Sequence, residues 1–297
     1  MNVAPMRPVE DVRPEGKSAR VILLVFALAG CAAPPVIRGA ENPILPTGRE
    51  SGSRDLLDYP QPTGDRPLLA IVIDDAGESI EQLEPFLDIP VPLSFSVLSA
   101  ASHPREVALS LEAQGRDVLA HIPMEPLSAD HMGGPGFLLT SMTTREIAKT
   151  LEWDLERVPG AKGVNNHMGS RFTRDRYAMA VVLAELKKRG LYFLDSRTDP
   201  ETVGREAARN ARVPFLERDV FLDNDPHVPE INRMMNRAVE VAHERGCAIA
   251  IGHPRPNTAA VIRRFALDPD RDVDVIPVTR LLGLPCRDSA HGTRPAR

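Results

Sequence analysis

The chain has 297 residues, of which 42% are hydrophobic and 26% charged, and its formal net charge is -5. These values are ordinary for a globular protein and exclude a fibrous or wholly disordered chain. A mildly acidic chain with 4% aromatic residues also lacks the basic surface and stacking rings of a nucleic-acid binder, so we expect no nucleic-acid partner.

Residues 1–31 have the order of a secretory signal. Basic residues precede the apolar run Val21 to Leu28, and small residues follow it before Cys31. The run is shorter than the roughly 20 apolar residues that cross a membrane, which disfavours a transmembrane helix. Leu28-Ala29-Gly30-Cys31 resembles the bacterial lipoprotein signal, in which the cysteine is lipidated. The sequence therefore predicts an exported protein, lipid-anchored through Cys31 at the periplasmic face of a bacterial membrane, with plain secretion as the alternative.

The rest of the chain divides into a linker, one domain and a tail. Residues 32–66 are rich in Pro, Gly, Ser and Arg without a sustained period, which is typical of a flexible tether. Residues 67–285 form the predicted domain, and residues 286–297 a disordered tail. Cys247 and Cys286 could pair in an oxidising compartment. We expect them to stay unpaired, because Cys247 opens an apolar, strand-like run and buried lone cysteines are common.

Short apolar runs alternate with longer amphipathic ones throughout the predicted domain, which indicates βα units, a largely parallel sheet and an α/β fold. The series favours an open doubly wound sheet or a barrel. The predicted strands are 68–73, 93–98, 117–121, 163–166, 192–195, 215–221, 248–252 and 273–278, and the predicted helices are 106–114, 144–158, 175–189, 230–245 and 258–265, with a capping box at 143–146.

Acidic residues and histidines follow several of these strands. Asp74 and Asp75 end the first run, and His121 and His167 end two later ones. Because the carboxyl ends of parallel strands converge on one crevice, this pattern favours a metal site made of two histidines and a carboxylate. A helix N-cap is the competing interpretation of a single Asp at such a turn.

Further polar residues follow later strands. Asp195, Asp219 and Asp223 could orient metal ligands, and His253 could serve as a general acid. A salt bridge of Arg218 with Asp219 or Asp223 is the competing interpretation, and for these two carboxylates the sequence favours neither. No serine-esterase elbow, Walker loop or dinucleotide-binding glycine motif is present.

The polar segments together resemble the divergent polysaccharide deacetylase family, and the resemblance extends from about residue 67 to residue 284. The segment 165–170 is the most specific of them. The segments are Ile71-Val72-Ile73-Asp74-Asp75-Ala76-Gly77, His121-Ile122-Pro123-Met124-Glu125-Pro126, Gly163-Val164-Asn165-Asn166-His167-Met168-Gly169-Ser170, Phe193-Leu194-Asp195-Ser196-Arg197-Thr198, Arg218-Asp219-Val220-Phe221-Leu222-Asp223 and Ile251-Gly252-His253-Pro254.

The resemblance implies an irregular (β/α) barrel of about seven strands, as in the polysaccharide deacetylases. It implies Asp74 as the catalytic base, Asp75 as a metal ligand and His253 as the acid, with His121 and His167 completing the ligand set. The better-known deacetylases draw both ligand histidines from one short segment, whereas His121 and His167 must meet in space. Residues expected to support the ligands or contact substrate are Glu125, Asn166, Ser170, Arg171, Asp195, Asp219 and Asp223.

The expected function is metal-dependent hydrolysis, with Zn²⁺ as the expected ion. The expected substrate is an N-acetylated envelope polysaccharide or peptidoglycan-type glycan, from which acetyl groups are removed. The alternative is a non-catalytic lipoprotein that keeps the fold and binds a glycan or a protein. A metal hydrolase acting on an ester or a peptide amide is a third possibility, because the residues that break these bonds are shared.

Overall fold

The structure, a computed structural model, describes residues 64, 66–128, 134–284 and 286. The predicted signal, the lipidation site Cys31 and nearly all of the predicted linker lie outside these residues. Within them, no helix combines the length and the apolar character needed to cross a membrane.

A nine-stranded sheet organises the described residues. The strands follow the order β6-β5-β4-β3-β2-β1-β8-β7, with β9 paired to β1, and every pairing is parallel. The strands are β1 (Leu68–Ala76), β2 (Ser94–Leu98), β3 (Asp117–Met124), β4 (Gly163–Met168), β5 (Tyr192–Asp195), β6 (Phe215–Glu217), β7 (Val220–Phe221), β8 (Cys247–Gly252) and β9 (Asp274–Val275).

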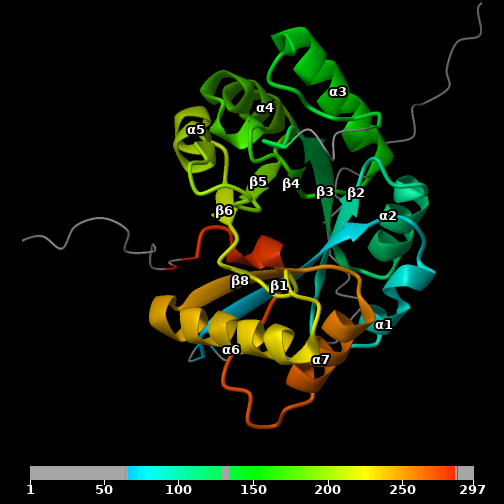
Figure 1. Cartoon of the computed structure of the whole chain (residues 1–297), viewed down its shortest axis with the longest axis vertical. Coiled ribbons are helices and arrows are strands. Elements are labelled where there is room, and N and C mark those ends of the chain that lie inside the picture. The colour runs from blue at the N-terminus through cyan, green and yellow to red at the C-terminus, as the bar shows by residue number, and fades with distance from the viewer. Residues whose placement is uncertain (1–63, 65, 129–133, 285, 287–297) are drawn as a thin grey trace, which may run out of the picture. The chain divides into compact units, whose positions relative to one another are not determined.

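Helices alternate with the strands and lie on the outside of the curled sheet (Figure 1). This arrangement is an irregular (β/α) barrel, which confirms the predicted fold class. The helices are α1 (Glu84–Leu87), α2 (Pro104–Ala113), α3 (Thr144–Arg157), α4 (Arg176–Arg189), α5 (Gly204–Ala211), α6 (Val228–Arg245) and α7 (Pro256–Ala266), and a short 3-10 helix, η4 (Val278–Leu281), follows β9.

Most predicted elements lie within a few residues of the observed ones. Strand β5 has the predicted bounds, and the capping box forms between Thr143 and Glu146 at the start of α3. The prediction of a single strand over 215–221 is wrong, because the backbone changes partner between Arg218, which bonds Asp195, and Asp219, which bonds Ile249, so that β6 pairs with β5 while β7 pairs with β8. Helix α5 was not predicted, since it buries only its small residues Gly204, Ala207 and Ala208.

The sheet has apolar residues on both faces. On β1, Leu69, Ile71 and Ile73 pack outward into the cluster that the helices cover, while Ala70 and Val72 pack inward into a second cluster. This alternation follows from the two-residue period of a strand. It sets the direction of the polar side chains that follow the apolar ones, because a polar residue in phase with Ala70 and Val72 points into the barrel.

Cys247 and Cys286 form a disulfide, with their Cα atoms 5.5 Å apart. The expectation that they stay unpaired is therefore wrong. Cys247 does open a buried strand, as the sequence indicated, but the segment after η4 returns to the start of β8 and brings Cys286 within bonding distance. The bond joins the domain to the first residue of the predicted tail.

Candidate active site

Asp74 and Asp75 leave the end of β1 and point toward the same region. Asp74 is in phase with Ala70 and Val72, and it is buried inside the barrel. An ordinary strand would turn Asp75 to the opposite face, but its φ of 55° lies in the left-handed region, and the pairing of β1 with β2 shifts register between Ile73 and Ala76. This local irregularity brings two adjacent carboxylates to one centre, at a cost in backbone strain that is typical of functional sites.

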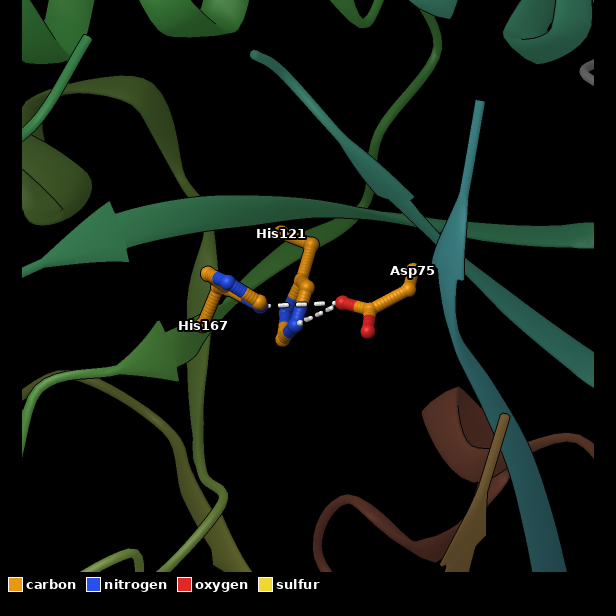
Figure 2. Close-up of side chains that lie close together, drawn as sticks. All are labelled: Asp75, His121 and His167. Atoms are coloured by element: carbon orange, nitrogen blue, oxygen red, sulfur yellow. Dashed lines mark hydrogen bonds and ion pairs between the residues drawn. The ribbon is translucent and has the colours of Figure 1, made fainter. Parts of the chain in front are cut away.

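Asp75, His121 and His167 converge although they come from β1, β3 and β4 (Figure 2). Oδ1 of Asp75 lies 3.2 Å from Nε2 of His121 and 2.9 Å from Nδ1 of His167. One ligand atom from each residue lies within 4.8 Å of the other two. Tetrahedral zinc with bonds of about 2.0–2.1 Å separates its ligand atoms by about 3.3 Å, so this donor set fits a zinc-type ion.

Two groups of the cluster, Asp75 and His121, stabilise each other's charged forms. Burial alone would lower the pKa of His121, but Asp74, Asp75 and the amide of Asn165 raise it to about 9. Burial would raise the pKa of Asp75, and its hydrogen bonds to His121 and His167 outweigh this and lower it strongly. Asp75 is therefore held as a carboxylate, the form that a metal ligand needs.

Asp74 lies beside this cluster with a different environment. Its Oδ2 is 3.6 Å from Nε2 of His121, and its Oδ1 accepts a hydrogen bond of 2.8 Å from Nδ2 of Asn165. Burial raises the pKa of Asp74, and the charge of His121 only partly opposes this. A carboxylate whose proton affinity is raised by its surroundings is suited to general base catalysis.

His253 follows β8 and faces the cluster from another side. Its Nε2 lies 3.8 Å from Oδ2 of Asp75, and its Nδ1 bonds Oδ1 of Asp223 at 2.7 Å. Oδ2 of Asp223 accepts from the hydroxyl of Thr258 and from the backbone N–H of His253. Burial would lower the pKa of His253, but the hydrogen bond and charge of Asp223 raise it, which favours an imidazolium able to donate a proton. Asp223 thus orients the predicted acid, and its contact with Arg255 is longer, at 3.9 Å.

Asp219 does not contact this cluster. Its carboxylate pairs with Arg245 and accepts the backbone N–H of Ile249. The salt-bridge interpretation of Asp219 therefore holds, but the partner is Arg245, because Arg218 instead donates to the backbone oxygens of Ser196 and Arg197.

Asp195 and Asn166 support the loop that follows β5. Asp195 accepts the hydroxyl of Thr202 and the backbone N–H of Arg197. Asn166 accepts the N–H of Ser196 and donates to the backbone oxygen of Met168. Both side chains fix the backbone near the cluster without reaching its ligand atoms.

Glu125, Ser170 and Arg171 support the loops beside the cluster. Oε2 of Glu125 accepts both the N–H and the hydroxyl of Thr140, and its Oε1 lies 3.4 Å from Nε of Arg171. The hydroxyl of Ser170 accepts the N–H of Leu127. Arg171 is half exposed, so it remains able to contact a bound substrate.

Asn165 was missing from the predicted site. Its amide touches both Asp74 and His121, and it also bonds the hydroxyls of Ser96 and Ser196. The sequence carried a usable signal, because Asn165 follows Val164 at an inward position of a buried strand, where an apolar residue is the norm.

Comparisons with known proteins identify the class of fold and the family. The sequence model described as divergent polysaccharide deacetylase matches residues 71–282, so the chain belongs to this family. The protein YibQ of Escherichia coli K12, itself uncharacterised, is 36% identical over 222 residues, covering 75% of this chain and 69% of YibQ. An uncharacterised protein of Haemophilus influenzae is 35% identical over 213 residues, covering 72% of this chain and 76% of its own.

A solved structure shows the same fold. An uncharacterised protein of Agrobacterium tumefaciens C58 superposes with a TM-score of 0.70 at 22% identity, covering 75% of this chain and 92% of its own. The crystal structure of this protein therefore has the same barrel fold as the present chain. The similarity carries no information about activity.

Proposed function

We propose that this protein is a divalent-metal-dependent hydrolase that removes N-acetyl groups from an envelope polysaccharide, with Zn²⁺ as the metal. The observation that carries the proposal is the convergence of Asp75, His121 and His167, whose ligand atoms lie within 4.8 Å of one another. A base and an acid flank them, since Asp74 lies 3.6 Å from His121 and His253 lies 3.8 Å from Asp75. Membership in the deacetylase family supports the same chemistry.

The chain supplies the proton transfers of amide hydrolysis. A divalent ion held by Asp75, His121 and His167 supplies Lewis-acid polarisation of the acyl carbonyl. Asp74 accepts a proton from the water that attacks the acyl carbon, and His253 donates its Nε2 proton to the departing nitrogen. The carbon–nitrogen bond breaks, and acetate and a free amine leave. The bond between His253 Nδ1 and Asp223 keeps Nε2 facing the site throughout.

We also propose that the protein acts at the periplasmic face of a bacterial membrane, anchored by lipid on Cys31. The order of basic, apolar and small residues before Cys31 supports export. The disulfide between Cys247 and Cys286 agrees with an oxidising compartment. Labelling with a radioactive fatty acid tests the anchor, since Cys31→Ser should abolish incorporation of the label. Incorporation equal to that of the wild type would contradict the anchor.

The proposed activity is tested by zinc content and acetate release from N-acetylglucosamine oligomers. The variant His167→Ala should lose both, because it removes a ligand that lies 2.9 Å from Asp75. The control His243→Ala removes a half-exposed histidine that pairs with Asp272 on the surface, and it should keep both. Full acetate release by His167→Ala would reject the site.

The same measurements separate the proposal from its rivals. A protein that only binds a glycan or a partner needs no stoichiometric zinc, so purified wild-type protein without zinc would favour that alternative. Zinc with no acetate release from sugars would direct the search to acetyl esters and peptide amides, because the same residues hydrolyse these bonds.

A further inference from the structure

Asn165 lies at the centre of a buried polar layer inside the barrel. It is fully buried on β4, directly across from His121 in the register of β3 and β4. Ser96 of β2 and Asp74 of β1 point inward in the same layer, and Ser196 joins it from the end of β5. The layer lies on the inward face of the sheet. Closer to the starts of the strands, the same face carries the apolar residues Val72, Leu119 and Leu194.

The amide of Asn165 uses both of its polar atoms. Oδ1 accepts the hydroxyl of Ser96 and lies 2.9 Å from Nδ1 of His121. Nδ2 donates to Oδ1 of Asp74 at 2.8 Å and to the hydroxyl of Ser196 at 3.3 Å. The side chain of Asn165 therefore links Asp74, the proposed proton acceptor, to the ring of His121, a proposed metal ligand.

The partners of Asn165 fix which way its amide faces. Nδ2 faces Oδ1 of Asp74 and Oδ1 faces the ring of His121 and the hydroxyl of Ser96. Oδ1 can only accept, so Nδ1 of His121 must carry the hydrogen that fills this contact. Nε2 of His121 then points to Asp75, 3.2 Å away, where a metal ligand is needed.

We propose that Asn165 is a positioning residue that sets the orientation and tautomer of His121 and aims the carboxylate of Asp74 at the same centre. The inference rests on the proposed function, and it adds a residue that couples the metal ligand to the base. Outer hydrogen-bond partners of this kind change metal affinity or activity by about 10- to 100-fold when they are removed.

The variant Asn165→Ala tests the proposal with three measurements. The first is zinc affinity in competition with a chelator, which should fall about 10- to 100-fold. The second is the proton NMR signal of the His121 Nδ1–H, identified by its loss in His121→Ala, which should vanish or exchange rapidly with water. The third is acetate release at saturating zinc, which should stay below the wild type because Asp74 has lost its donor.

Ser96→Ala is the matched control. It removes another buried hydrogen bond to the same oxygen of Asn165, but it leaves the contacts with His121 and Asp74 in place. Its zinc affinity should stay within about threefold of the wild type, and the His121 signal should persist. Equal losses in both variants would reduce Asn165 to a packing role and overturn the proposal, as would wild-type zinc affinity in Asn165→Ala.

A second variant keeps the test decisive if Asn165→Ala does not fold. Asn165→Asp has nearly the same shape and keeps an acceptor for the Nδ1–H of His121, but it places an oxygen where the amide donor faced Oδ1 of Asp74, so the two carboxyl groups must share a proton. Its zinc affinity should therefore fall less than that of His121→Ala, while acetate release should fall because Asp74 is no longer free to accept a proton. A loss of zinc affinity as large as that of His121→Ala would overturn the proposal. The NMR signal needs neither zinc nor turnover, so it still tests Asn165 if the wild type fails to bind zinc or to release acetate and the proposed function falls.

Discussion

Asp154 on α3 is a buried carboxyl group outside the proposed active site. Its side chain is fully buried, and Oδ1 accepts a hydrogen bond of 2.7 Å from the hydroxyl of Ser99. Oδ2 has no hydrogen-bond partner within the described part of the chain. Arg157 lies nearby, but its guanidinium donates to the backbone oxygens of Ser99 and Ala101. The charged form of Asp154 is therefore poorly compensated.

Burial raises the pKa of Asp154 from 3.8 to about 7, against the opposing effects of Ser99 and Arg157. At about 1.36 kcal/mol per pKa unit, this shift corresponds to about 4 kcal/mol. Because the folded protein holds the proton more tightly than the unfolded chain, folding stability is higher when Asp154 is neutral. The stability is lost as pH rises from about 4 to about 7.

The variant Asp154→Asn should remove this part of the pH dependence. The amide still accepts from Ser99, but its Nδ2 replaces an oxygen that has no partner, which costs about 1–3 kcal/mol. We expect the variant to be less stable than the wild type near pH 4 and more stable by about 1–3 kcal/mol near pH 8, so that the two curves cross.

Urea unfolding at a series of pH values measures the difference in the free energy of unfolding between the two proteins. The difference isolates Asp154, because the other titrating groups are shared. Ser99→Ala is the opposite perturbation, since it removes the donor to the carboxylate and should steepen the decline with pH. A difference between Asp154→Asn and the wild type that stays constant from pH 4 to pH 8 would refute the reasoning.

Three further predictions concern the disulfide, the acid and a helix cap. Cys286→Ser opens a bond that spans 39 residues of sequence, and the chain-entropy model gives a loss of about 4 kcal/mol in the free energy of unfolding, measurable with urea under oxidising conditions. Asp223→Asn removes the carboxylate from His253 and should lower acetate release by about 100-fold at unchanged zinc content, whereas equal turnover would contradict the acid role. Thr143→Ala removes half of a capping box and should cost about 1 kcal/mol of stability by thermal or urea unfolding, with no effect on zinc content.

The strands and the ends of the strands were predictable because they follow from local patterns. Buried parallel strands appear in the sequence as short apolar runs, and the runs before Asp74 and His253 end where β1 becomes irregular and where β8 ends, whereas β3 continues past His121 to Met124. The convergence of strand ends on one edge of the barrel then brings the polar residues together. The residues of the proposed site could therefore be selected without knowing any distance.

Contacts that depend on tertiary geometry could not be predicted. The pairing of Asp219 with Arg245 rather than Arg218 depends on the change of backbone partner between β6 and β7. The disulfide depends on the path of the chain after η4, and no local sequence pattern predicts that path. Sequence analysis could have found Asn165, since a polar residue at an inward strand position needs partners, but its partners come from β1, β2, β3 and the loop after β5.

The distribution of the site over several strands makes its geometry depend on the curl of the sheet. Asp75 and His121 come from β1 and β3, which are separated by β2, and neighbouring strands lie about 4.8 Å apart. Their side chains meet inside the barrel, where the hydroxyl of the β2 residue Ser96 joins the layer around Asn165. A site taken from one short segment would depend on that segment's backbone. Here the ligand positions depend on inward side chains of different strands, so a bulky side chain in place of Ser96, which would displace the neighbouring Asn165, should lower zinc affinity more than changes in the exposed loops around the site, whereas the small change Ser96→Ala should not.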